Sequence, residues 1–80
     1  MKQELTLSAL RPGETAVLRR MLSTGTLRRR LRDLGFVEGA RLRCTLRGAG
    51  GDPCAYAVGG GVFALRRRDS ALLLVEREEG

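Results

Sequence analysis

Residues 40–47 read ARLRCTLR, and apolar and polar side chains alternate strictly along this stretch. The even positions are apolar, whereas the odd positions hold three arginines and one threonine. Because successive side chains of a strand point to opposite faces, the pattern predicts a strand that is buried on one face only. A strand with one solvated face is typical of antiparallel sheets, so we expect a mainly β fold in which this strand has a basic outer face.

Four further segments on either side of this stretch are predicted to be strands, because turn residues rich in glycine, proline and polar side chains bracket them. They are residues 14–22, 54–58, 62–66 and 71–77. The segment 67–70 is long enough for one helical turn only. Five short strands predict a small barrel or rolled sheet, since closure removes exposed strand edges.

One segment, TLRRRLRDL at residues 26–34, has the periodicity of a helix. Leu27, Leu31 and Leu34 recur at spacings of four and three residues and form one apolar stripe. We expect the hydroxyl of Thr26 to cap the first turn, and Gly35 to end the helix in the left-handed conformation.

Arg28, Arg29 and Arg30 fall in the first turn of that predicted helix, where the helix macrodipole favours acidic side chains. Each cation is expected to cost about 0.3–1 kcal/mol there at low ionic strength. Two interpretations stay open. Either the arginines are solvated and the penalty is tolerated, or they meet an anionic partner.

The composition narrows the class of protein. The 80 residues predict one domain, and residues 76–80 (EREEG) have the character of a solvated tail. Lys and Arg number 15 against 9 acids, which gives a formal charge of +6, and all but Lys2 of the basic residues are arginine.

Histidine is absent, which excludes histidine-based catalysis and His-ligated metal sites. The apolar runs are too short for a membrane span, and residues 1–10 do not resemble a secretory signal, so we expect a cytoplasmic protein.

The two cysteines are expected to be reduced, and Cys44 to be a small core residue. If residues 48–53 form a hairpin loop, Arg47 faces Cys54, and Cys44 lies three residues farther along its strand. That offset is about 10 Å, which exceeds the Cα separation of about 7 Å that a disulfide tolerates. No third cysteine or histidine is present to complete a zinc site. We therefore predict neither a disulfide nor a bound metal.

Catalysis is not expected. The glycines in 48–51 and 59–61 resemble a phosphate-binding loop only in composition, since no Lys-Ser/Thr pair and no helix follow them. The carboxylates adjoin turns or arginine runs, and no two of them form a recognisable acid–base pair. We predict that the protein is not an enzyme and needs no cofactor.

Arginine is the remaining candidate for function. If the helix lies beside the strand at 40–47, the arginines of the two elements form one surface for a partner. This predicted partner surface consists of Arg28, Arg29, Arg30 and Arg32 from the helix and Arg41 and Arg43 from the strand. It could meet nucleic acid, an anionic membrane or an acidic protein, or be simply solvated. Aromatic residues are only 4% of the chain, which argues against binding single-stranded nucleic acid.

Three stretches carry a resemblance to a known family: LTLSALRPGETAVL (5–18), LRRRLRDLGFVEG (27–39) and GGDPCAYAVGGGVFALRRRDSALLLV (50–75). In their order and spacing these three stretches resemble the FeoA family. Its members are small cytoplasmic accessory proteins of bacterial ferrous iron uptake. The matching positions include Gly13, Leu31, Leu34, Gly35, Gly39, Pro53, Leu65 and Arg66. Glu38 and Ser70 depart from the family pattern, which usually has proline and alanine there.

The resemblance implies an SH3-like β-barrel with no catalytic residues and no cofactor. It also implies that the protein binds the cytosolic side of FeoB, the membrane iron transporter with a G-protein-like domain, and supports or modulates transport or GTP hydrolysis. The protein would then be peripheral to the inner face of the cell membrane and not inserted in it. The alternative hypothesis is a basic nucleic-acid-binding SH3-like barrel or regulatory module. The oligomeric state stays open.

Overall fold

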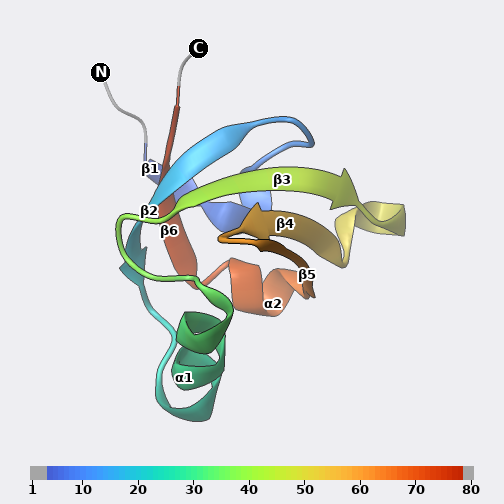
Figure 1. Ribbon diagram of the computed structural model, residues 1–80. Coiled ribbons are helices and arrows are strands. Elements are labelled where there is room, and N and C mark those ends of the chain that lie inside the picture. Colours follow the sequence, from blue (N-terminus) through green and yellow to red (C-terminus); the bar gives the residue numbers. More distant parts are fainter. Residues whose placement is uncertain (1–3, 79–80) are drawn as a thin grey trace.

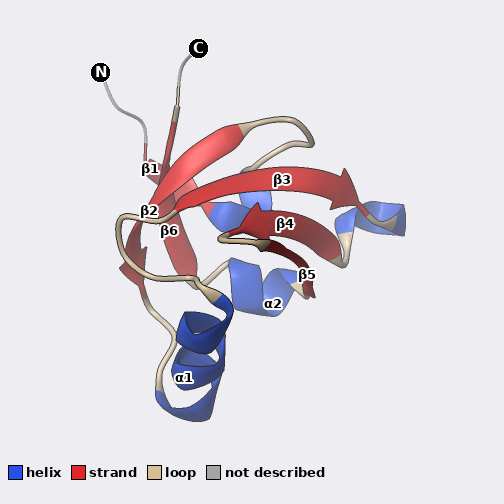
Figure 2. Cartoon of the chain, in the orientation of Figure 1, coloured by secondary structure: helices blue, strands red, loops and turns tan. Residues whose placement is uncertain are grey.

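The computed structural model describes residues 4–78 and contains a strongly bent, six-stranded antiparallel sheet (Figures 1 and 2). The strand order is β1-β6-β2-β3-β4-β5. The strands are β1 (Glu4–Thr6), β2 (Thr15–Met21), β3 (Arg41–Arg47), β4 (Cys54–Val58), β5 (Gly61–Leu65) and β6 (Leu73–Arg77). The helices are α1 (Gly25–Leu34), the single turn α2 (Arg67–Ser70) and the 3-10 turns η1 (Leu7–Ala9) and η2 (Ala49–Gly51).

The prediction of a mainly β fold with one helix longer than a single turn is confirmed. The five predicted strands all form, with ends that differ by at most two residues. The sheet gains a sixth strand, β1, which pairs antiparallel with β6 so that Leu5 lies opposite Val75. Three residues are too few to show an alternation, so the sequence carries no strand signal for β1.

The core lies inside the bent sheet, and η1 closes one side of it. Leu42 and Cys44 of β3 point inward, as the alternation predicted, and both are fully buried. Tyr56 of β4 is also fully buried, and its hydroxyl donates a hydrogen bond to the carbonyl oxygen of Leu7 at 3.4 Å. Burial raises the pKa of Tyr56 to about 12, so the phenol stays neutral and keeps its donor proton at physiological pH.

Both cysteines are free, as predicted, and Cys54 is buried as well as the predicted core residue Cys44. Arg47 lies directly opposite Cys54 in the β3–β4 ladder, whereas Cys44 lies opposite Tyr56. This register keeps the two thiols out of disulfide geometry. Burial raises the pKa of Cys44, which disfavours its thiolate form.

The predicted solvated tail at residues 76–80 is wrong for residues 76–78, and residues 79–80 lie outside the described part. Glu76 and Arg77 belong to β6, and Glu76 forms an ion pair with Arg19. Glu78 follows the strand and pairs with Arg41. These acids therefore belong to the sheet and neutralise arginines on it.

Candidate interaction surface

Helix α1 stands at one end of the sheet and projects away from β3 and β4 (Figure 1). Its apolar stripe holds it there, because Leu31 is fully buried in the core while Leu27 and Leu34 pack against the core half-buried. The predicted stripe is confirmed. The opposite side of the helix is exposed and is available to a partner.

The start of α1 differs from the prediction. The helix begins at Gly25, preceded by Thr24 as the N-cap residue, and the Thr24 side chain makes no capping hydrogen bond. Thr26 therefore lies inside the first turn, and its predicted capping role is wrong. The earlier start moves Arg29 and Arg30 into the second turn. The macrodipole acts mainly within the first turn, so the cost of these cations is smaller than the sequence suggested.

The end of α1 follows the prediction. Gly35 has φ +111°, and its N–H donates to the carbonyl oxygen of Arg32 at 3.0 Å. The N–H of Phe36 donates to the carbonyl oxygen of Leu31 at 2.9 Å, which completes a Schellman motif. Phe36 is fully buried, and its ring centroid lies 6.3 Å from that of Phe63. This termination anchors the end of the helix to the barrel.

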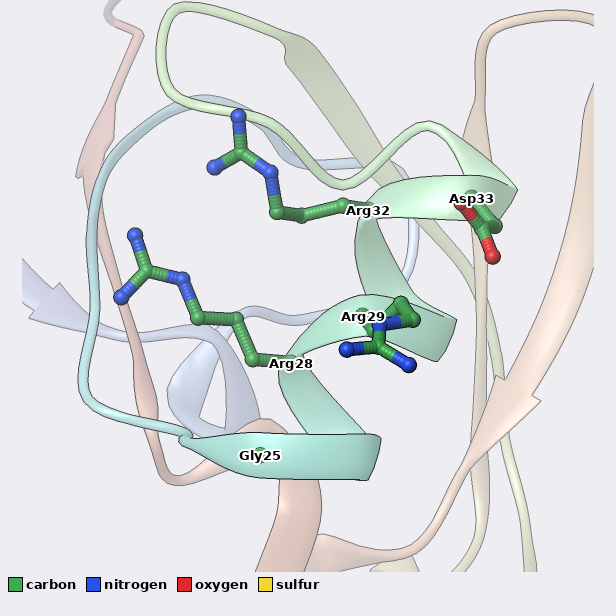
Figure 3. Close-up of a pocket in the computed structure, with 5 residues that line it drawn as sticks. All are labelled: Gly25, Arg28, Arg29, Arg32 and Asp33. Carbon is green, nitrogen blue, oxygen red and sulfur yellow. The ribbon is translucent and has the colours of Figure 1, made fainter.

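The exposed side of α1 forms a shallow depression, shown in Figure 3. Arg28 and Arg32 are one helical turn apart and extend in the same direction, while Arg29 and Asp33 point elsewhere around the helix. The lining residues are Gly25, Arg28, Arg29, Arg32 and Asp33. The structure thus brings three of the four predicted helix arginines into one depression, and Arg30 is exposed outside it.

Glu38 neutralises part of this surface. The Nη1 of Arg32 donates to Oε1 of Glu38 at 3.0 Å. The pKa of Glu38 is lowered, first by a contact with its own backbone N–H and then by the hydrogen bond from Arg32 and the charges of Arg32 and Arg28. Within residues 4–78, Arg28, Arg29 and Arg30 have no carboxylate within 4.0 Å. These three side chains form an unneutralised basic surface, which we call the α1 basic surface.

Arg41 and Arg43 lie apart from the α1 basic surface, on a depression over β2, β3 and β4. The cause is the register of the sheet. Arg41 lies opposite Val17, whereas β2 continues to Met21 before the chain enters α1. Four residues of strand span about 13 Å, so the two arginine groups do not merge as the sequence suggested. Glu78 also pairs with Arg41, while Arg43 has no carboxylate within 4.0 Å among residues 4–78.

Three glycines at family positions meet a backbone requirement of the scaffold. Gly13, Gly35 and Gly39 all have positive φ, between +90° and +111°, which side-chain-bearing residues rarely adopt. Leu65 is buried, and Arg66 is exposed directly before α2. Pro53 follows a cis peptide bond in the loop between β3 and β4.

Residues 4–78 contain no group of three or more His, Cys, Asp or Glu side chains placed to hold a metal ion. Nor does any helix in this part of the chain combine the length and the apolar character needed to cross a membrane.

Two acids bear on the candidate surface, and the sequence predicts no specific partner for either. Glu78 falls in the predicted tail, and Glu38 is one of the carboxylates beside turns and arginine runs for which only solvated salt bridges are expected. A sequence signal exists for Glu38, because it follows Arg32 closely across a glycine-terminated helix end. No such signal exists for Glu78, because only the strand order, in which β6 and β3 both flank β2, brings Glu78 close to Arg41.

The FeoA domain family matches residues 5–77 of the chain. A comparison with curated protein sequences found no significant match. Three solved structures are similar in sequence as well as in fold.

The first is iron(II) transport protein A from Clostridium thermocellum, at 33% identity and a TM-score of 0.87. The match covers 91% of this chain but only 45% of that longer chain. The second is FeoA from Chlorobium tepidum, at 32% identity and a TM-score of 0.88, covering 95% of this chain and 72% of that chain. The third is the zinc complex of FeoA from Stenotrophomonas maltophilia, an SH3 domain protein, at 36% identity and a TM-score of 0.79. It covers 89% of this chain and 88% of that chain. Together with the domain match over nearly the whole length, these similarities show that the chain has an SH3-like fold and belongs to the FeoA family.

Proposed function

We propose that this protein is an accessory protein of ferrous iron uptake that binds the cytosolic part of a FeoB-type transporter. Members of the FeoA family are non-catalytic accessory proteins of ferrous iron transport. The S. maltophilia relative is a candidate activating factor of ferrous iron transport. By this relationship the protein acts in the cytoplasm, at the inner face of the membrane, and supports or modulates transport or GTP hydrolysis by its partner.

The observation that carries the proposal is the α1 basic surface. Arg28, Arg29 and Arg30 are exposed and lack carboxylate partners among residues 4–78, on a helix that Leu31 anchors to the barrel. An anchored helix presents its side chains with little further loss of backbone freedom on binding. A basic surface of this kind favours an acidic partner protein beside an anionic membrane. We place Arg32 at the edge of this surface and Arg41 and Arg43 on a second, smaller part of the contact.

The test is binding to the cytosolic domain of the cognate transporter, and to the intact transporter in membranes, in each nucleotide state. Arg28, Arg29 and Arg30 are replaced together by glutamate. The matched control replaces Arg11, Arg20 and Arg68, which are also exposed, by glutamate. Each triple variant lowers the formal charge from +6 to 0, since every replacement changes the charge by two units. The comparison therefore separates the position of the charge from its amount.

We expect the α1 variant to lose binding and the control variant to retain most of it. Equal binding by the α1 variant and the wild type would contradict the assignment of the α1 basic surface as the contact surface. Failure of the wild-type protein to bind the transporter in any nucleotide state would contradict the proposed function itself. Retardation of DNA or RNA in a gel at low salt, with a steep salt dependence and no transporter binding, would favour the nucleic-acid alternative.

A further inference from the structure

Strand β5 forms one edge of the sheet and is unprotected there. Within residues 4–78 it pairs with β4 alone, and its residues make no other backbone hydrogen bond to the rest of the chain. Its sequence, GVFAL, contains no charged residue and no proline. Edge strands are normally guarded by such residues because unpaired backbone groups attract other strands. An apolar edge without this protection is suited to pairing with another segment.

The outer face beside this edge is also apolar. Val62 of β5 and Leu46 of β3 are 60% and 63% exposed, and they are two of the three large apolar side chains exposed in the described part. Ala57 lies opposite Val62, and Ala55 lies opposite both Leu46 and Ala64. A bulge after Cys44 brings Leu46 to the outer face. We call Leu46, Ala55, Ala57, Val62 and Ala64 the apolar strip.

A basic cluster lies at the end of β5. Leu65 is opposite Cys54, which in turn is opposite Arg47, and Arg66 follows directly. The guanidinium groups of Arg47 and Arg67 both approach Gly51, where a Cβ atom would lie 3.2 Å and 2.7 Å from their Nη2 atoms. Nη2 of Arg67 donates to the carbonyl oxygen of Gly50 at 3.3 Å.

The cluster is not neutralised by carboxylates of the described chain. No carboxylate of residues 4–78 lies within 4.0 Å of the guanidinium groups of Arg47, Arg66 or Arg67. Asp52 accepts a hydrogen bond from the backbone N–H of Arg67 instead. Three arginines without a carboxylate partner in the described part of the chain, at one end of an open strand, favour an anionic group at that position.

We propose that the open edge of β5 binds an extended acidic segment of a partner protein as an additional strand. The backbone of that segment would pair with β5, alternate apolar side chains would lie on the apolar strip, and an acidic residue would meet Arg47, Arg66 and Arg67. A second copy of this chain fits less well, because two chains with a formal charge of +6 repel one another. The surface shares no residue with the α1 basic surface, so the inference stands independently of the proposed function.

The test begins with selection of short peptides from a random displayed library by the immobilised full chain. We expect the selected sequences to alternate β-branched or aromatic residues with others and to carry Asp or Glu at one end. A selected peptide, made synthetically and labelled, is titrated by fluorescence anisotropy and mapped by amide NMR shifts. Its N-methylated form is the control, because methylation removes the N–H groups needed for strand pairing.

Val62→Glu and Arg66→Glu are each expected to weaken binding about tenfold. Val62→Thr, which keeps the β-branched shape, and Arg29→Glu, which makes the same charge change on α1, should bind nearly as the wild type does. Shifts confined to β5, the apolar strip and Arg66 would support the proposal. Selection of basic or proline-rich peptides, or no enrichment of any peptide, would overturn the proposal. So would undiminished binding of the N-methylated peptide. A dimer of this chain in which the β5 amides are protected from hydrogen exchange without any peptide would also overturn it.

Discussion

Arg41 and Glu78 form an ion pair with two hydrogen bonds, from Nε to Oε1 at 2.9 Å and from Nη2 to Oε2 at 2.8 Å. The pair reaches across β2, because Arg41 begins β3 and Glu78 follows β6, and both strands flank β2. The hydrogen bond and the charge of Glu78 raise the pKa of Arg41, and Arg41 lowers the pKa of Glu78. An arginine predicted to meet a partner is therefore held by an acid of its own chain.

Glu78→Gln should release Arg41 and tighten binding to the transporter's cytosolic domain by about twofold, since the internal ion pair no longer competes with the partner. Isothermal titration at low salt measures the change. Glu4→Gln, which removes the same charge from an exposed position on β1, is the control. Identical affinities of the two variants would place Arg41 outside the contact.

The lowered pKa of Glu38, caused first by its own backbone N–H and then by Arg32, should make stability depend on pH. The folded-state pKa of Glu38 lies below its unfolded-state value. The stabilisation is therefore complete above about pH 5 and is lost as the pH falls through the folded-state pKa. In urea titrations, Glu38→Gln should be less stable than the wild type at neutral pH, and the difference should disappear as the pH falls through the folded-state pKa of Glu38. A difference independent of pH would mean that the charge of Glu38 has no role.

Gly35→Ala should lower the free energy of unfolding by about 1–2 kcal/mol, because φ +111° is unfavourable for a residue with a Cβ atom. Steric conflict is not the cause, since the nearest atom to a Cβ at this position is Cγ2 of Val58 at 3.6 Å. Gly60→Ala is the matched control. Gly60 has no positive φ and no atom within 4 Å of an added Cβ, so we expect a change near zero. Equal destabilisation by both variants would contradict the conformational explanation.

Leu31→Ala should cost about 2–5 kcal/mol, because Leu31 is the one side chain of α1 that is fully buried in the core. The variant keeps every charge but loosens the attachment of the helix, so transporter binding should fall as well. Leu31→Met, which nearly conserves volume, should cost less than about 1.5 kcal/mol and leaves a folded comparison if the alanine variant unfolds. Full binding by a folded, destabilised Leu31→Ala protein would show that the helix need not be anchored.

Local sequence patterns predicted the helix and five of the six strands, because each of these segments carries its own signal. The alternation at 40–47 identified the buried and exposed faces of β3 as far as Cys44 but placed Leu46 wrongly on the buried face, because the bulge after Cys44 turns it outward. The spacing of Leu27, Leu31 and Leu34 identified the anchored face of α1. Gly35 marked the end of the helix, since a left-handed residue is a local requirement. The start of the helix differs because the prediction relied on a threonine side-chain cap, whereas Thr24 precedes the helix without making a capping hydrogen bond.

For the candidate surface, the sequence determined which residues carry charge and which faces they occupy within their own elements. Only the tertiary structure decided which charges remain free. Strand order pairs Glu78 with Arg41 and Glu76 with Arg19, whereas the helix end pairs Glu38 with Arg32. Within residues 4–78 these pairings leave Arg28, Arg29 and Arg30 without a carboxylate partner. The open edge of β5 is likewise a property of the sheet order. The physical reason is range: periodicity and turn chemistry act over a few residues, whereas ion pairing and strand pairing join residues that are distant in the chain.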